Sequence, residues 1–310
     1  MLKVVFLGTP EFAAPCLRGL VEAGHRICLV VTQPDRPKGR GRKTVAPPVK
    51  TAADEMGLPL FQPVAIRSDD AIARIAGQSP DVLVVAAFGQ LLPEPLLTVA
   101  PGGAVNVHAS LLPRFRGPAP IQWAVIRRET ETGITTMQMD TGIDTGDILL
   151  TAATAIQRTD TAGTLHDRLK DMAPALLIRT LEAMEKGRLK PRPQDDALAT
   201  YAPLLRKGDG LIDWRQSAGD IEAFVRGMNP WPGAFTRHEG KRLKIFAARP
   251  EPDEPSAPPG TVVEVSEAAI RVATGKGTLA VLELQAASGK RQATETFVRG
   301  YRLPENEKFH

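Results

Sequence analysis

The chain has 310 residues, of which 43% are hydrophobic and 24% charged, with 39 Lys and Arg against 35 Asp and Glu. This composition is typical of a soluble globular protein and excludes a disordered or collagen-like chain. The length favours about two domains, each large enough to bury its own core. The formal net charge of +4 suits an anionic partner without identifying one.

Signals for membrane insertion, export and disulfide formation are absent from the sequence. No apolar run approaches the roughly 18 residues that a membrane-spanning helix needs, and the start MLKVVFLGTP enters a strand directly. Cys16 and Cys28 have no further Cys or paired His around them, so we expect two reduced thiols and no zinc site. A cytoplasmic protein is expected.

The first elements in chain order predict an α/β fold. Residues 2–7 form an apolar run typical of a buried strand, residues 11–23 carry apolar side chains at helical spacing, and residues 27–32 predict another strand. Strand, helix and strand in succession open a βαβ unit. The turn after the first strand has a single glycine before Thr9-Pro10, so the dinucleotide-binding fingerprint G-x-G-x-x-G is missing.

A basic segment, QPDRPKGRGRKTVAPPVK at 33–50, follows, and its prolines and glycines predict no regular element. Its positive residues are Arg36, Lys38, Arg40, Arg42, Lys43 and Lys50. One interpretation is a solvated loop, the usual fate of a run of charges. The other is a flexible basic arm that lies against phosphates and becomes ordered on contact.

Strands and helices continue to alternate up to about residue 188. We expect helices at 47–56, 68–75, 121–128 and 161–186, and strands at 81–87, 104–107, 132–139 and 147–156. Pro174 predicts a kink or break in the last of these helices. Such alternation predicts a mainly parallel, doubly wound, Rossmann-like sheet, with ligands bound beyond the carboxyl ends of its strands.

The pattern changes after residue 188. Prolines and charges at 189–207 predict a linker, and Arg206 and Lys207 at its end either touch nucleic acid or form a solvated hinge. In residues 208–310 a short helix at 217–228 and a turn with a buried tryptophan at 229–235 precede β-prone pieces. Their spacing predicts a small open β-barrel of the OB type. Such barrels often bind oligonucleotides, and the local basic residues are Arg237, Lys241, Arg242 and Lys244.

The stretch from Asn106 to Asp147 concentrates groups that can do chemistry. Asn106 and His108 are two residues apart at the end of a predicted strand, so their side chains point to the same side. An amide N–H can stabilise an oxyanion, and an imidazole can carry a proton near neutral pH. Asp144 lies in the turn TGIDTGD, where a carboxylate could orient the histidine.

Structural explanations for the same residues stay open. Asn-x-His at a strand end occurs in caps and turns, and Asp140, Asp144 and Asp147 could be Asx-turn residues. The three aspartates show no convincing ligand spacing, so no metal is predicted.

The complete string resembles a known family. It reads Asn106-x-His108-x-Ser110-Leu111-Leu112-Pro113-x-x-Arg116-Gly117, followed at fixed spacing by Thr135, Met137, Asp140 and Asp144. It is similar to the formyltransferases that use 10-formyltetrahydrofolate. The basic segment resembles the insertion loop of methionyl-tRNA formyltransferases, and the motifs IDW at 212–214 and NPWP at 229–232 resemble their carboxyl-terminal domain.

The resemblance implies a function and a role for particular residues. The activity would be transfer of a formyl group from 10-formyltetrahydrofolate to the α-amino group of methionine on initiator methionyl-tRNA, by a monomer without a metal. The catalytic residues would be Asn106, His108 and Asp144. The folate site would contain Phe88, where the family often has tyrosine, together with Gly89, Leu91, Ser110, Leu111, Leu112 and Pro113. The tRNA contacts would come from Arg36, Lys38, Arg40, Arg42, Lys43, Arg206 and Lys207.

Two rival functions remain at this point. A formyltransferase for a small amine, or a hydrolase of formyltetrahydrofolate, would share the central motif, although the basic segment and the second domain count against both. A non-catalytic RNA-binding protein would use the barrel and the basic arm and keep the first domain as a scaffold.

Overall fold

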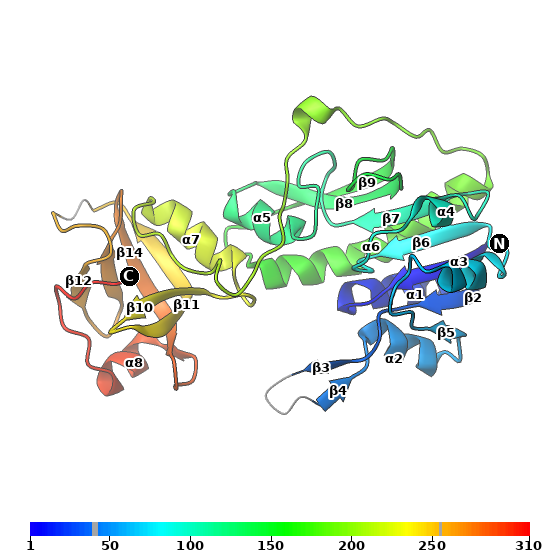
Figure 1. Cartoon of the computed structure of the whole chain (residues 1–310). Helices are drawn as coiled ribbons and strands as arrows, with labels where there is room; N and C mark the ends of the chain where they lie inside the picture. Colours follow the sequence, from blue (N-terminus) through cyan, green and yellow to red (C-terminus); the bar gives the residue numbers. More distant parts are fainter. Residues whose placement is uncertain (39–42, 254–255) are drawn as a thin grey trace. The chain divides into compact units, whose positions relative to one another are not determined.

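The computed structural model describes residues 1–38, 43–253 and 256–310 and shows two compact units (Figure 1). Unit 1 comprises residues Met1–Gly117, Glu131–Thr154 and His166–Ala202, and unit 2 comprises Pro118–Thr130, Ala155–Leu165 and Pro203–His310. Both units are therefore discontinuous in sequence. In the described residues, no helix is long and apolar enough to cross a bilayer.

Unit 1 is built on a seven-stranded sheet with the strand order β5-β2-β1-β6-β7-β8-β9. The bounds are β1 Lys3–Gly8, β2 Arg26–Val31, β5 Leu60–Phe61, β6 Val82–Ala86, β7 Ala104–His108, β8 Glu131–Gln138 and β9 Ile148–Ala155. Strands β5, β2, β1, β6 and β7 pair in parallel, and β8 runs antiparallel to β7. The chain winds outward from β1 in both directions, which confirms the predicted doubly wound fold. In sheets of this kind ligands bind beyond the carboxyl ends of the strands.

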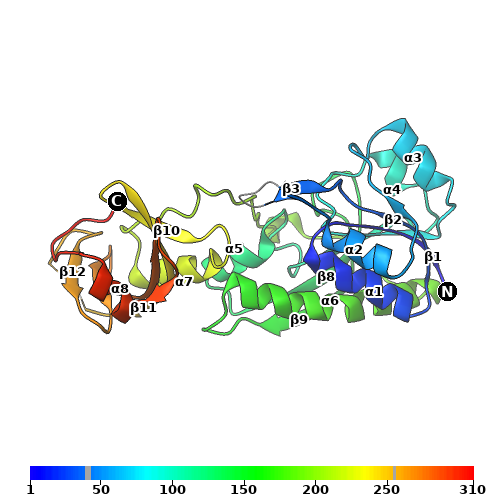
Figure 2. The same cartoon turned by 90° about the horizontal axis from the view of Figure 1, so that it is seen from below.

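Helices cover both faces of this sheet. Figure 2 shows α1 (Ala14–Glu22) and α6 (Ala162–Glu185) on one side, and α3 (Asp69–Ala76) and α4 (Glu94–Leu97) on the other. Strand alternation explains this arrangement, since Val5 and Leu7 of β1 pack in one cluster with Ile75 of α3 and Leu96 of α4. The short η1 (Glu11–Ala13) precedes α1, and α2 (Pro48–Glu55) lies beside both.

Helix α6 runs through 24 residues without interruption, and Pro174 lies inside it. The predicted break at this proline is wrong. Two neighbouring residues of α1 and α6 are close, because a Cβ added to Gly19 would lie 3.1 Å from the Cβ of Pro174. Packing against α1 thus helps to keep this part of the helix in place, which sequence propensity alone does not consider.

The basic segment contains a two-stranded antiparallel hairpin, formed by β3 (Arg36–Lys38) and β4 (Lys43–Val45). The expectation of no regular element was wrong here. A proline is tolerated in an edge strand, where a missing N–H can face solvent, and both strands of this two-stranded ribbon are edges; Pro37 pairs with Thr44. At the base of the hairpin, hydrogen bonds from Gln62 and Lys50 hold the pKa of the Asp35 carboxyl below its usual value.

Unit 2 contains a six-stranded antiparallel sheet with the order β10-β11-β14-β13-β12, in which β15 also pairs with β14. The strands are β10 Ala234–His238, β11 Lys241–Glu251, β12 Val262–Val265, β13 Ile270–Ala273, β14 Thr278–Ala286 and β15 Gln292–Ala293. The helices are α5 Pro120–Ile126, α7 Ala218–Gly227 and α8 Thr294–Gly300. The five longer strands match the predicted pieces, whereas β15 and α8 were not predicted.

Tryptophans take different positions in unit 2. Trp214 is buried in the core and donates its indole N–H to Thr236 Oγ1 at 3.0 Å. Trp231 in the motif NPWP is 48% exposed, so the predicted buried tryptophan at this turn was wrong. Trp123 in α5 packs against the core of unit 2 and donates to the carbonyl oxygen of Pro203 at 2.9 Å.

Candidate active site

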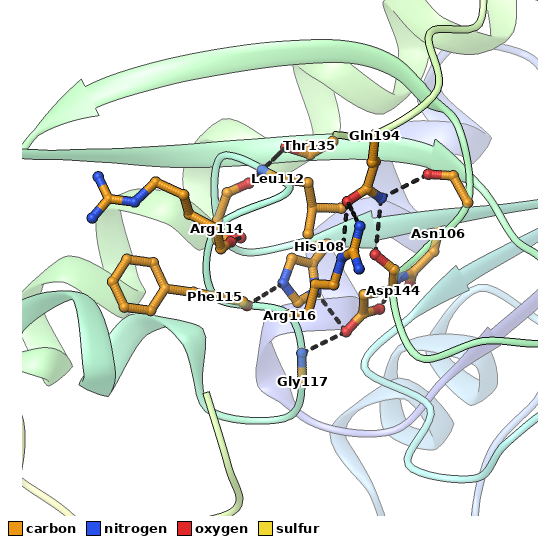
Figure 3. A network of polar contacts seen from close by, with 12 residues as sticks. Asn106, His108, Leu112, Arg114, Phe115, Arg116, Gly117, Thr135, Asp144 and Gln194 are labelled. Carbon is orange, nitrogen blue, oxygen red and sulfur yellow. Dashed lines mark hydrogen bonds and ion pairs between the residues drawn. The ribbon is translucent and has the colours of Figure 1, made fainter. Parts of the chain in front are cut away.

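Three polar side chains meet at the carboxyl end of β7 (Figure 3). Asn106 and His108 lie two residues apart on this strand and are 9% and 6% exposed. Asp144 reaches them from the turn between β8 and β9: its Oδ1 is 3.4 Å from Asn106 Nδ2, and its Oδ2 is 3.6 Å from His108 Nδ1. The sequence-predicted trio therefore comes together in unit 1.

The turn that carries Asp144 depends on its glycines and on its own polar contacts. Asp144 has φ +55°, in the left-handed region that L-residues rarely adopt. A Cβ on Gly146 would come within 1.7 Å of the carbonyl oxygen of Gln138, so only glycine fits there. Asp140 accepts hydrogen bonds from Gly142 N and Thr145 Oγ1, which is the Asx-turn role considered for it.

Each ring nitrogen of His108 faces an oxygen atom. Nε2 lies 2.9 Å from the carbonyl oxygen of Phe115, and Nδ1 faces the Asp144 carboxylate. A carbonyl oxygen can only accept, so Nε2 carries a proton in this arrangement. Nδ1 faces the Asp144 carboxylate, which fixes the orientation of the ring.

The loop after β7 is fixed by hydrogen bonds to β8 and by its own turn. Thr135 Oγ1 donates to the carbonyl oxygen of Ser110 at 2.7 Å and accepts from Leu112 N at 3.1 Å. Ser110 Oγ donates to the carbonyl oxygen of Arg114 at 2.6 Å. At the end of the loop, Gly117 N donates to Asp144 Oδ2 at 2.8 Å, which ties the loop to the catalytic candidate.

Two further residues contact this site, and neither was predicted as a site residue. Arg116, which is only 2% exposed, donates to Gln194 Oε1 through Nε at 3.0 Å and Nη2 at 2.9 Å. Gln194 Nε2 in turn donates to the carbonyl oxygens of Asp144 and Gly146. Gln194 lies in the segment predicted to be a linker, and no local pattern there distinguishes it.

Comparisons with known proteins identify the family. A formyl transferase domain matches residues 2–181, and a formyl transferase carboxyl-terminal domain matches residues 204–302. The methionyl-tRNA formyltransferase of Pelotomaculum thermopropionicum is 50% identical over 98% of this chain and 97% of its own length. The corresponding protein of Desulfotalea psychrophila is 47% identical over 97% of this chain and 94% of its own length. The chain belongs to the methionyl-tRNA formyltransferase family.

Solved structures of formyltransferases share the fold. An N-formyltransferase from Helicobacter canadensis has a TM-score of 0.65 at 16% identity and covers 91% of this chain and 99% of its own. Glycinamide ribonucleotide transformylase 1 from Symbiobacterium toebii has a TM-score of 0.52 at 24% identity over 63% of this chain and 95% of its own. HypX from Aquifex aeolicus in complex with tetrahydrofolic acid has a TM-score of 0.63 at 16% identity, over 100% of this chain and 51% of its own.

The residues predicted for a folate site have different environments in this family member. The Phe88 ring is 2% exposed and packs in the core of unit 1, so the ring itself lines no open space. Its carbonyl oxygen accepts hydrogen bonds from Thr9 Oγ1 and Gln33 Nε2, both at 2.9 Å. Gly89 has φ +83°, and Leu91 is 75% exposed.

The second part of the predicted folate set is the segment Ser110 to Pro113. Ser110 is fully buried, and Leu112 packs with Met137 and Ile148. Leu111 and Pro113 are half-buried. This segment follows His108 directly, so it is the part of the predicted folate set that adjoins the trio in sequence.

The basic residues predicted to contact tRNA fall into three groups. Arg36 is exposed, and its Nη2 donates to Gln33 Oε1 at 2.6 Å. Lys38 ends β3 and Lys43 begins β4, whereas Arg40 and Arg42 lie outside the described residues. Arg206 and Lys207 are exposed in unit 2, at a turn where Arg206 N donates to Asp209 Oδ2 at 2.7 Å.

Proposed function

We propose that this protein transfers a formyl group from 10-formyltetrahydrofolate to the α-amino group of methionine on initiator methionyl-tRNA. The observation that carries the proposal is identity of 47–50% to methionyl-tRNA formyltransferases over nearly the whole chain. HypX, which shares this fold, has been solved in complex with tetrahydrofolic acid, and this supports a folate donor. Convergence of an amide, an imidazole and a carboxylate in unit 1 is consistent with acyl transfer.

The proposed mechanism begins with a neutral amine. An α-amino group has a pKa of about 7.7 to 8.0, so much of it is protonated at neutral pH and must lose a proton before it attacks. The amine nitrogen forms a bond to the formyl carbon, and the carbonyl oxygen becomes an oxyanion. Asn106 Nδ2 donates to this oxyanion, since its contact with Asp144 is long at 3.4 Å and its amide has a second N–H.

Collapse of the tetrahedral intermediate breaks the bond between the formyl carbon and the folate nitrogen. That nitrogen needs a proton, and the amine has one to give up. We assign this transfer to His108, whose Nε2 hydrogen-bonds Phe115 O and whose Nδ1 faces the Asp144 carboxylate in this structure. Asp144 orients the ring. The formyl donor is already activated, so the reaction needs no nucleoside triphosphate.

The folate is proposed to contact the segment Ser110 to Pro113 and the connection that includes Gly89 and Leu91. Because the Phe88 ring is buried in the core, Phe88 would shape this wall through its backbone and packing. The exposed Leu91 offers an apolar surface for a pterin or benzoyl ring.

The tRNA is proposed to contact both the basic hairpin and the turn with Arg206 and Lys207. Exposed positive side chains bind phosphates through charge and counterion release. We further propose a catalytic domain built mainly from 1–188 and a tRNA-binding domain built mainly from 208–310, in a monomeric cytoplasmic protein. The predicted linker at 189–207 connects them, and its residues up to Ala202 lie in unit 1.

One assay tests this function against its rivals. The protein is incubated with formyl-labelled 10-formyltetrahydrofolate and, separately, charged initiator tRNA, charged elongator methionyl-tRNA and free methionine. The proposal predicts label on initiator methionyl-tRNA above all. Label only on small amines, or release of formate without acceptor, would identify one of the enzymatic rivals. Binding of tRNA with no donor turnover would favour the non-catalytic RNA-binding protein.

A further inference from the structure

The segment after α6 is attached to the candidate active site along its length. This segment, residues 192–202, is called the strap below, and Figure 1 shows it as extended chain with a short η2 turn (Asp196–Leu198). At its start, Arg192 and Ile148 exchange two backbone hydrogen bonds of 2.8 and 2.9 Å. At its end, Arg116 N donates to Thr200 O at 2.8 Å, and Ala202 N donates to Arg116 O at 2.7 Å. All these residues belong to unit 1.

Between these two attachments, the side chain of Gln194 points into the site (Figure 3). Its Nε2 donates to Asp144 O at 2.8 Å and to Gly146 O at 2.7 Å, so both amide hydrogens are used. Its Oε1 accepts from Arg116, which can only donate, and this fixes which end of the amide faces the turn. Gln194 therefore holds two carbonyls of the Asp144 turn and one buried cation at the same time.

Arg116 anchors Gln194. Its side chain is 2% exposed, and a buried guanidinium is costly unless it is fully paired. Besides Gln194, it contacts Asp196 Oδ1 at 2.8 Å, but the Asp196 side chain is 84% exposed. Asp196 thus shares the arginine with Gln194 while facing solvent, and within the described part of the chain its side chain contacts Arg116 and not the Asp144 turn.

Asp144 needs outside support in its present conformation. At φ +55° its backbone is in the left-handed region, which is strained for a residue with a Cβ. The carboxylate direction follows from this backbone, and its Oδ2 must face both Gly117 N and His108 Nδ1. A rotation of the turn would remove the carboxylate from the histidine.

We propose that Gln194 is a positioning residue for formyl transfer: it fixes the Asp144 turn so that the carboxylate faces His108. The inference rests on the proposed function for its kinetic consequence, but its structural consequence can be measured without turnover. It also assigns part of the predicted linker to the catalytic unit.

The kinetic experiment compares Gln194→Met with Asp196→Ala. Methionine keeps the length of the Gln194 side chain and removes its hydrogen-bond donors and acceptor. The control, Asp196→Ala, removes the other strap side chain that contacts the Arg116 guanidinium. Gln194→Met should lower kcat by about tenfold to 10²-fold, with KM for donor and tRNA within about twofold, because misplacement by about 1 Å has effects of this size. Asp196→Ala should retain kcat within about twofold.

A double-mutant test separates positioning from general destabilisation. In an Asp144→Ala background, Gln194→Met should have almost no further effect on kcat, because residues that act through one another are not additive. An undiminished further loss would overturn the proposal. So would a wild-type kcat in Gln194→Met, or an equal loss in Asp196→Ala.

The imidazole 15N shifts of His108 provide a readout that is independent of activity. At a fixed pH near neutrality, the Nδ1 shift should move in Gln194→Met, because the Asp144 carboxylate no longer faces this nitrogen, and should stay unchanged in Asp196→Ala. If wild-type protein shows no formyl transfer but the ring responds in this way, the proposed function fails and the positioning role stands. If Gln194→Met does not fold, Gln194→Glu keeps an acceptor for Arg116 and is measured instead. Failure of both variants to fold would make Gln194 a folding residue and refute the proposal.

Discussion

Replacement of Asp144 by asparagine removes one negative charge and leaves the shape of the side chain almost unchanged. The amide oxygen can still accept from Gly117 N, whose distance to the carboxylate is 2.8 Å. The charge 3.6 Å from His108 Nδ1 is lost. Asp144→Asn should therefore fold and bind substrates but transfer formyl groups slowly.

The size of the effect follows from the distance and the burial. Full charges at 3.6 Å attract by about 5 kcal/mol at an effective dielectric constant of about 20. Desolvation of both groups offsets much of this, and a residual attraction of about 1.5 to 3 kcal/mol, the scale of a charge-assisted contact, remains. Because about 1.4 kcal/mol corresponds to a factor of ten in rate, kcat should fall by about 10- to 150-fold.

Initial rates of formyl transfer at varied donor and tRNA concentrations give kcat and KM separately. Asp140→Asn is the matched control, since the Asp140 carboxylate accepts from Gly142 N and Thr145 Oγ1 within the same turn. The control should keep kcat within a few-fold. Equal losses in both variants would mean that the turn matters only for folding, and an unchanged kcat in Asp144→Asn would refute the role given to the charge.

Three further predictions concern stability and tRNA binding. Gly146→Ala should destabilise unit 1 by about 1–3 kcal/mol in urea unfolding, because the added Cβ would lie 1.7 Å from the carbonyl oxygen of Gln138. Gly208→Ala is the control and should be neutral, because a Cβ there would have no atom within 4 Å. Burial, and then the charge of the amino terminus, lower the pKa of His25 in the folded protein. The stability that neutral His25 contributes is present above its unfolded-state pKa of about 6.5 and is lost as the pH falls. His25→Gln should therefore flatten the loss of stability between about pH 7 and pH 5. Arg36→Gln and Arg206→Gln should each weaken tRNA binding and reduce the salt slope by about 1, and an unaltered slope would remove that arginine from the interface.

Local patterns in the sequence predicted most of the secondary structure and the trio of the site. Periodicity identified the strands of both units, and α3 begins where the sequence predicts a helix, with Ser68 Oγ accepting from Ala71 N at its start. The spacing of Asn106 and His108 placed both side chains on one side of β7 because strand geometry allows little else. The contact with Asp144 came from the resemblance and from the glycine-rich turn.

The remaining features depend on contacts that are distant in sequence. Gln194 is 50 residues from Asp144, and the proline- and charge-rich segment around it predicts only a linker. Phe88 follows a buried strand and precedes a connection, so burial of its ring depended on packing with α3 and α4. The β3–β4 hairpin pairs short strands whose composition disfavours regular structure. Local patterns of residues along the chain do not predict such contacts between distant segments.

Single-turnover formyl transfer in Asn106→Ala tests the central claim most directly. Enzyme in excess over labelled initiator methionyl-tRNA is mixed with saturating 10-formyltetrahydrofolate and quenched at successive times, and tRNA binding is measured in parallel. If the Asn106 amide stabilises the oxyanion, the transfer rate should fall by about 10²- to 10³-fold while the Kd for tRNA stays within a few-fold. A transfer rate equal to that of the wild type, or an equal loss of transfer and binding, would contradict the account.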